Sequence, residues 1–107
     1  MRPAEEAQRR LVRQWLARAE EDFGVAQHLL SEGSPYLRAI GFHSQQAVEK
    51  FLKAVLVRHQ VEFRKTHNLG ELLDLIATVD ATLAESLREA TALNPYGVDV
   101  RYPTSLT

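Results

Sequence analysis

The sequence predicts an all-α protein, and three observations carry that prediction. Apolar residues recur at steps of three and four along most of the chain, and no stretch alternates apolar and polar residues as a strand would. Gly, Pro and Asn fall between these stretches, where helices begin and end. The links are short, which favours an up-and-down antiparallel helical bundle of four main helices in a single domain.

The first helix is expected over residues 3 to about 32. Pro3 suits a first turn, because its missing N–H has no helical partner there. The apolar stripe of this helix comprises Leu11, Trp15, Ala19, Phe23, Ala26 and Leu30. Glutamates and arginines cover the opposite side, which we interpret as a solvated face. Two i, i+4 ion pairs are expected on that face, Glu5–Arg9 and Glu6–Arg10.

Residues 34 to 59 predict the helix around which the others pack. Gly33 is expected to end the first helix, Ser34 to cap the second, and Pro35 to occupy its first position. So short a link makes the two helices an antiparallel hairpin. One apolar sector comprises Ile40, Ser44, Ala47, Val48, Phe51 and Val55, and a second side holds Phe42, Leu52 and Leu56. We expect the second side to be shared with another copy of the chain in a homodimer.

Residues 60 to 67 are expected to form a connector. A third helix should begin near Asn68, with Asn68 and Glu71 as a capping pair. Asp80 is expected to cap a fourth helix, which Asn94 and Pro95 would stop. The residues after Pro95 are too few and too interrupted for another packed helix.

Composition excludes several classes of protein. The net charge of the 107 residues is -1, so any anion site must be local. The chain has no Cys, which excludes disulfides and thiolate metal sites, and no spacing of His and carboxylates predicts a metal or another cofactor. No apolar run is long enough to span a membrane and the N-terminus is charged, so we expect a cytoplasmic protein.

A polar stripe on the central helix is the leading candidate site, and it comprises His43, Gln46, Lys50 and Lys53. Two ammonium groups and an amide along one face could hold phosphates and a base edge. The alternative is that both lysines are solvated, with Glu49 pairing Lys53. Asp22 of the first helix is either an ordinary boundary carboxylate or a partner for a Lys or His of the central helix.

Two further groups are candidates for contacts to a ligand. In the connector, Arg64, Lys65 and His67 could bind phosphates, although His67 is equally suited to capping or packing. Near the end of the chain, Arg101 and Tyr102 could contact a phosphate and stack on a base, or could close the bundle.

Four segments resemble the HEPN domain family of small α-helical bundles. They are AEEDFGVAQHLL, FHSQQAVEKFLKAVLV, THNLGELL and NPYGVDVRYP, which occur in the family's order over about residues 15–103. The resemblance implies a bundle that is commonly dimeric and binds nucleotides or RNA. It also implies a minimal nucleotidyltransferase partner in a two-component, toxin–antitoxin-like pair. The last helix of the family, which usually follows the RYP segment, has no counterpart in this sequence.

Some HEPN branches are ribonucleases that carry an Arg, four to six residues and a His late in the domain. Here Arg101 has no His after it, and the match to this spacing is Arg38-x4-His43. The two could supply a cation and a proton-transfer group without a metal. Five residues on a helix separate side chains by about 140°, so such a ribonuclease would need Arg38 and His43 from different subunits. A third possibility is a protein-interaction module with no ligand.

Overall fold

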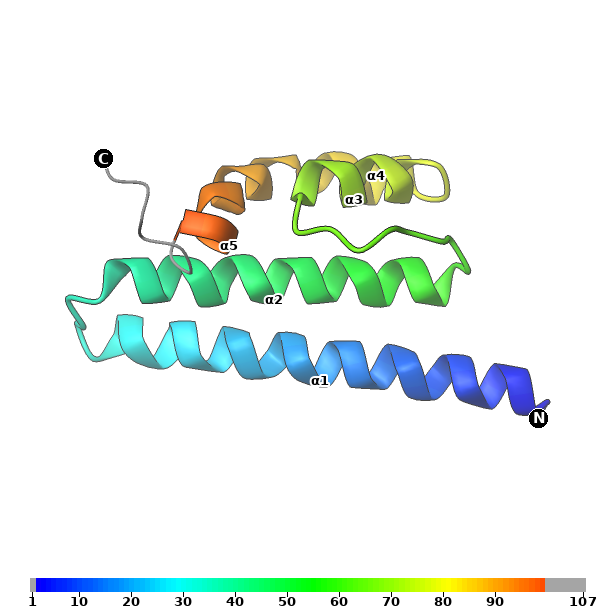
Figure 1. Cartoon of the computed structure of the whole chain (residues 1–107), viewed down its shortest axis with the longest axis horizontal. Helices are drawn as coiled ribbons and strands as arrows, with labels where there is room; N and C mark the ends of the chain where they lie inside the picture. The colour runs from blue at the N-terminus through cyan, green and yellow to red at the C-terminus, as the bar shows by residue number, and fades with distance from the viewer. Residues whose placement is uncertain (1, 100–107) are drawn as a thin grey trace.

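The computed structural model describes residues 2–99, and these residues form helices joined by short turns and, over residues 59–68, by an irregular connector (Figure 1). In chain order the elements are α1 (Pro3–Ser31), α2 (Leu37–Arg58), α3 (Leu69–Ala77), α4 (Ala81–Ser86), the 3-10 helix η1 (Arg88–Leu93) and α5 (Asn94–Asp99). No strand occurs in this part of the chain, so the prediction of an all-α fold is confirmed.

The long helix α2 lies in the middle of the molecule, with α1 on one side and α3 to α5 on the other (Figure 1). Gly33 ends α1 with a φ of 65°, in the left-handed region that glycine adopts most easily. The N–H groups of Gly33 and Ser34 donate to the carbonyl oxygens of Leu30 and Leu29, which makes a Schellman motif. The predicted C-terminal role of Gly33 and the antiparallel hairpin are therefore confirmed.

The start of α2 differs from the prediction by a short distance. The hydroxyl of Ser34 accepts a hydrogen bond from the N–H of Tyr36, only two residues later, and Leu37 is the first helical residue. Ser34 thus closes a local turn around Pro35 and does not cap the helix, because its side chain finds a nearer backbone donor.

Small residues make the contact between α1 and α2. Ala19 and Ala26 of α1 and Ala47 and Ala54 of α2 are all buried, which allows the two helices to approach closely. Phe23 belongs to the predicted apolar stripe but is 58% exposed. The stripe on α1 is therefore wider than the surface that α2 covers, and its edge faces away from the central helix.

The second apolar side of α2 is buried inside the chain. Leu52 and Leu56 have no exposed surface and form the core with side chains of α3 and α4. The residues that pack with them are Leu69, Leu72, Leu73, Ile76 and Ala84. The prediction that this side of α2 contacts another copy is therefore wrong in its location, and the homodimer itself stays a prediction.

The predicted caps of α3 and α4 are both present. The side-chain oxygen of Asn68 accepts from the N–H of Glu71 at 3.1 Å, and that of Asp80 accepts from the N–H of Leu83 at 3.0 Å. The fourth helix, however, is not continuous. α4 ends at Ser86, whose hydroxyl donates to the carbonyl oxygen of Leu83, and η1 follows. Such hydroxyl-to-carbonyl bonds compete with the regular helical ladder.

Asn94 and Pro95 begin the short helix α5, where the sequence predicted a stop. Pro95 lies in its first turn, a position that tolerates proline, and Asn94 accepts a hydrogen bond from the N–H of Leu69 at 2.8 Å. α5 packs on α2, because the ring of Tyr96 occupies the space that a Cβ atom on Gly41 would fill. The prediction that no packed helix follows Pro95 is therefore wrong.

Candidate functional site

Asp22 of α1 lies between two residues of the predicted polar stripe. Its Oδ1 atom is 2.8 Å from Nδ1 of His43, and its Oδ2 atom accepts a hydrogen bond of 2.5 Å from Nζ of Lys50. The Asp22 side chain is 12% exposed, whereas those of His43 and Lys50 are 30% and 22% exposed. Of the two roles that the sequence left open, the structure supports the partner of a His and a Lys on the central helix.

Glu49 is the centre of a second and more deeply buried cluster, the Glu49 network. Its carboxylate accepts hydrogen bonds from Lys53 at 3.0 Å and Gln45 at 3.1 Å. Nδ1 of His67 lies 2.8 Å from the same carboxylate, and Gln46 donates to the side-chain oxygen of Gln45. The predicted Glu49–Lys53 pair is confirmed. The accompanying interpretation that Lys53 is solvated is wrong, because its side chain is only 7% exposed.

Aromatic rings complete the surroundings of the Lys53 ammonium group. Its Nζ atom lies 5.4 Å from the centroid of Trp15 in α1 and 5.9 Å from that of Phe63 in the connector. These are cation–π distances, and such contacts strengthen when the cation has lost its water. Lys53 therefore joins α1, α2 and the connector at one buried point.

The environment of Glu49 favours its charged form. Burial raises the pKa of the carboxyl, but hydrogen bonds from His67, Lys53 and Gln45, together with the positive charge of Lys53, outweigh that effect. The pKa in the folded protein is therefore below the ordinary value of 4.5.

The folded state should lose stability in acid through Glu49. Because folding lowers the pKa of Glu49, its contribution is complete above about pH 4.5 and is lost as the pH falls through the lower folded-state pKa. Urea unfolding measured at a series of pH values from neutral to acid would show this loss. The variant Glu49→Gln should lack this component. An equally steep acid dependence in that variant would contradict the assignment.

Each lysine of the polar stripe is neutralised by a neighbouring carboxylate. Lys50 and Lys53 each have a carboxylate oxygen within 3.0 Å, so a phosphate would have to displace Asp22 or Glu49. Gln46 is buried and bonded to Gln45. This geometry favours a structural role, in which the stripe fastens α1 and the connector to α2.

Arg38 and His43, the residues of the ribonuclease spacing, are not brought together within one chain. Arg38 is exposed in the first turn of α2, whereas the Nδ1 atom of His43 is held by Asp22. Both lie on one regular helix, which keeps their side chains about 140° apart.

The connector residues have separate surroundings. Arg64 makes a two-pronged contact with the carboxylate of Glu71, at 2.8 and 2.7 Å. Lys65 is exposed and forms no ion pair with any of residues 2–99. His67 belongs to the Glu49 network, as the packing alternative predicted. Arg101 and Tyr102 lie outside the described residues.

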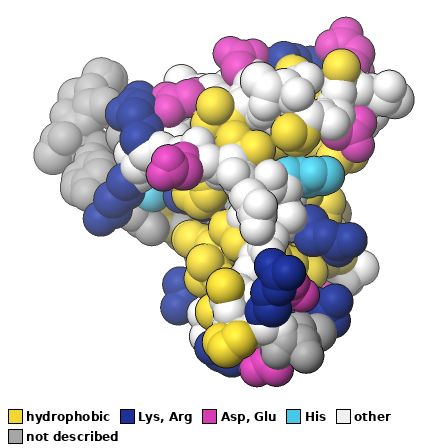
Figure 2. Space-filling model, turned by 90° about the vertical axis from the view of Figure 1, so that its right-hand side faces the viewer, with side chains coloured by type: hydrophobic (Ala, Val, Ile, Leu, Met, Phe, Trp, Pro, Cys, Tyr) yellow, Lys and Arg dark blue, Asp and Glu magenta, His cyan; other side chains and the backbone are white. Residues whose placement is uncertain are grey.

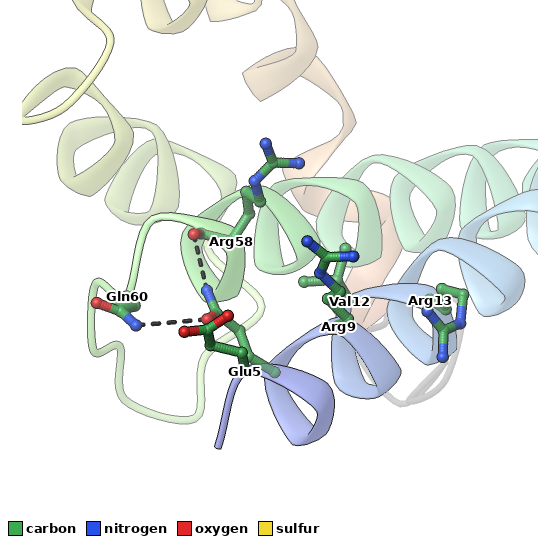
Figure 3. A pocket seen from close by; sticks show the side chains of 7 residues that line it. Glu5, Arg9, Val12, Arg13, Arg58 and Gln60 are labelled. Atoms are coloured by element: carbon green, nitrogen blue, oxygen red, sulfur yellow. Dashed lines mark hydrogen bonds between the residues drawn. The ribbon is translucent and has the colours of Figure 1, made fainter. Parts of the chain in front are cut away.

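A cationic surface lies where α1 begins and α2 ends (Figure 3). Its arginines on α1 were expected to belong to an ordinary solvated face. We call this surface the arginine groove. It is an open cavity of about 600 Å³, lined by Glu5, Gln8, Arg9, Val12, Arg13, Arg58 and Gln60. Seen from this end, Lys and Arg side chains surround hydrophobic ones (Figure 2). The amide of Gln8 donates to the carbonyl oxygens of Val57 and Arg58, each at 2.9 Å, and so fixes α1 against α2.

The guanidinium groups of the arginine groove have no carboxylate partner in the described part of the chain. Arg9, Arg13 and Arg58 form no ion pair with any residue between 2 and 99. The predicted pairs Glu5–Arg9 and Glu6–Arg10 are absent; Glu5 instead lies 3.9 Å from Arg2. Exposed pairs of this kind gain little energy and order two long side chains, so their absence has a small cost. It leaves the cations free for a ligand.

A signal for the arginine groove was present in the sequence. The short link at Gly33 predicts an antiparallel hairpin, and such a hairpin places the start of α1 beside the end of α2. Arg58 must therefore lie near Arg9 and Arg13. The charge run was interpreted on α1 alone, so this proximity was missed.

Two classes of site are absent from the part of the chain that the structure describes. No three His, Asp or Glu side chains in residues 2–99 are grouped so that they could hold a metal ion. None of the helices there combines the length and apolar character needed to cross a lipid bilayer.

The fold and the site define a small all-α domain built on a helical hairpin. A buried network of paired charges lies inside it, and at one end lie arginines that form no ion pair with the rest of residues 2–99. The chain belongs to the HEPN domain family, whose model matches residues 12–107. The resemblance inferred from the four sequence segments is thereby confirmed. No curated protein and no solved structure shows significant similarity to the chain.

Proposed function

We propose that this HEPN domain protein is a nucleotide- or RNA-binding component that acts with a minimal nucleotidyltransferase in a two-component, toxin–antitoxin-like system. Membership of the family supports the general class of function. The partner is inferred from the family alone, and co-expression with such a nucleotidyltransferase tests it. Separate elution of the two proteins in size-exclusion chromatography would count against the partnership.

The observation that carries the binding function is the arginine groove. Three guanidinium groups that have no carboxylate partner among residues 2–99 surround a cavity of about 600 Å³, a size within the range of small-molecule sites. Guanidinium groups bind phosphates through two parallel N–H donors. The amides of Gln8 and Gln60 line the same cavity and could contact a sugar or a base.

This location differs from the polar stripe, where each lysine already has a carboxylate. The ribonuclease alternative requires Arg38 and His43 from two subunits, with Nε2 of His43 as the proton-transfer atom because Nδ1 faces Asp22. The interaction-module alternative requires no ligand at all. One binding experiment separates the three possibilities.

The protein would be titrated with ATP and with a fluorescent single-stranded RNA at two salt concentrations. We expect binding that weakens with salt, because phosphate contacts release counterions. The double variant Arg9→Gln/Arg58→Gln should bind RNA at least about tenfold more weakly at low salt and show a smaller salt dependence. Fluorescence anisotropy gives both quantities.

The control is Arg38→Gln, which removes one positive charge at the opposite end of α2, where the double variant removes two from the groove. It should leave binding nearly unchanged, and an equal loss in both variants would show diffuse attraction and not a groove. The RNA would also be recovered and checked for cleavage. Cleavage that disappears in His43→Ala would favour the ribonuclease, and a complete lack of binding would favour the interaction module.

A further inference from the structure

The arginine groove continues into an apolar hollow along α2, and the two cavities share part of their walls. Val12 of α1 and Arg58 of α2 line both of them. The hollow has a volume of about 300 Å³, and we call it the Phe51 hollow. Its other lining residues are Leu16, Phe51, Ala54, Val55, His59 and Leu83. A ligand in the groove therefore has an apolar cavity directly beside it.

Arg58 lies at the junction of the two cavities. Its side chain is exposed and points away from Glu5 and Gln60 (Figure 3). It forms no ion pair with any of residues 2–99. A guanidinium group can bind a phosphate through its N–H donors and stack on a flat ring with its face. This one side chain can thus contact the charged part and the flat part of the same ligand.

The walls of the Phe51 hollow suit a flat aromatic group. Phe51 is 39% exposed although it belongs to the central helix, so its ring is open to a ligand. His59 adds a second exposed ring just after the end of α2. Nucleic-acid bases stack on aromatic side chains and on the planes of guanidinium groups. The hollow therefore offers several planar groups to a base.

The two cavities together define the class of ligand. Arg9, Arg13 and Arg58 favour a group that carries several negative charges at one end. The Phe51 hollow favours an uncharged group at the other end, because most of the residues that line it are apolar. A nucleoside triphosphate has this distribution of charge. An internal stretch of RNA instead has one phosphate per nucleotide, spread along its whole length.

The spacing of the two cavities agrees with such a ligand. Arg9 and Leu16 are seven residues apart on α1, which is about 10 Å along the helix axis. An extended nucleoside triphosphate covers a distance of this order between its base and its last phosphate. A single ligand can therefore reach both cavities.

We propose that the arginine groove and the Phe51 hollow form one site for a nucleoside triphosphate, with the phosphates at the guanidinium groups and the base in the hollow. This assignment rests on the proposed binding function and adds the class of ligand, a free nucleotide in preference to an internal stretch of RNA. It also gives Phe51 and the flat face of Arg58 a role that phosphate binding alone does not require.

The test compares ATP with inorganic tripolyphosphate, which has the same chain of phosphates and no base, by isothermal titration calorimetry. Phe51→Ala should weaken the binding of ATP by about tenfold, because the base loses its stacking partner. It should leave the binding of tripolyphosphate unchanged, which also shows that the variant is folded. Arg58→Lys keeps the charge and removes the flat face, so it should weaken ATP more than tripolyphosphate.

Phe23→Ala is the matched control, because Phe23 is an exposed phenylalanine that does not line the Phe51 hollow. It should change the binding of neither compound. If Phe51→Ala bound ATP as tightly as the wild type, the base would lie elsewhere and the groove would be a plain phosphate site. Tighter binding of dodecyl phosphate than of ATP would assign the hollow to an aliphatic chain.

Two further results would overturn the proposal. A single-stranded RNA with a 5′-hydroxyl end that displaces ATP at an equal or lower concentration would make RNA the preferred ligand. That result would leave the proposed binding function intact. The absence of binding for ATP, tripolyphosphate and RNA alike would overturn the binding function together with the nucleotide site.

Discussion

Replacing Glu49 with Gln should lower the free energy of unfolding by about 3–5 kcal/mol, the cost of leaving one member of a buried ion pair without its partner. The substitution keeps the shape of the side chain and removes only its charge. Lys53 would then be an ammonium group, 7% exposed, with no other carboxylate of residues 2–99 at ion-pair distance. His67 and Gln45 would also lose a charged acceptor. Urea denaturation at neutral pH measures the effect.

Asp22→Asn is the matched control for this prediction. It also removes one carboxylate that binds two basic side chains, but Lys50 and His43 are partly exposed and can recover water. Its expected cost is therefore about 1 kcal/mol. In the Glu49→Gln background, the second change Lys53→Met should recover much of the loss, because no buried charge remains. Equal costs for Glu49→Gln and Asp22→Asn would contradict the distinction between the two clusters.

Gly41→Ala is expected to destabilise the domain by up to about 2 kcal/mol, although alanine is the better helix former. The new methyl group would overlap the ring of Tyr96, including the ring carbon nearest to its backbone. Either the ring or α5 must move, and overpacking of this kind costs about 1–3 kcal/mol before the gain in helix propensity of about 1 kcal/mol is subtracted. Thermal unfolding would give the loss, and faster proteolysis near Tyr96 would locate it.

Gly24→Ala provides the comparison in the same protein. Gly24 lies inside α1, and a Cβ atom there would meet nothing within 4 Å. The substitution should therefore stabilise the domain by about 1 kcal/mol through helix propensity alone. If both glycine variants changed the stability in the same direction, the close contact between Tyr96 and α2 would not explain the effect of Gly41→Ala.

Local sequence determined where several helices begin and end. Gly33, Asn68 and Asp80 were assigned correctly because each acts on backbone groups only a few residues away. The same kind of reasoning failed at Ser34, and it did not predict that the fourth helix is interrupted after Ser86. The hydroxyl of Ser34 bonds to the N–H of Tyr36, and that of Ser86 to the carbonyl oxygen of Leu83. Serine has several such local bonding patterns open to it, and sequence alone does not rank them.

The family was also determined by sequence, since the order of four short segments was enough to identify the HEPN domain. One part of the interpretation of the polar stripe, the Glu49–Lys53 ion pair, followed from local spacing, because the two residues lie one turn apart on a single helix. The sequence also offered, as one of two roles for Asp22, that of a partner for a Lys or His of the central helix. It could not specify Lys50 and His43, which lie more than twenty residues further along the chain.

Tertiary structure alone decided which surfaces stay open. Periodicity showed that α2 is apolar on two sides, but only the packing of α3 determined that Leu52 and Leu56 are covered and Phe51 is not. The arginine groove likewise depends on the register of the hairpin, fixed by contacts such as Gln8 with the carbonyl of Arg58. The physical reason is that caps and turns are short-range interactions along the chain, whereas burial and the pairing of distant charges depend on how whole helices pack.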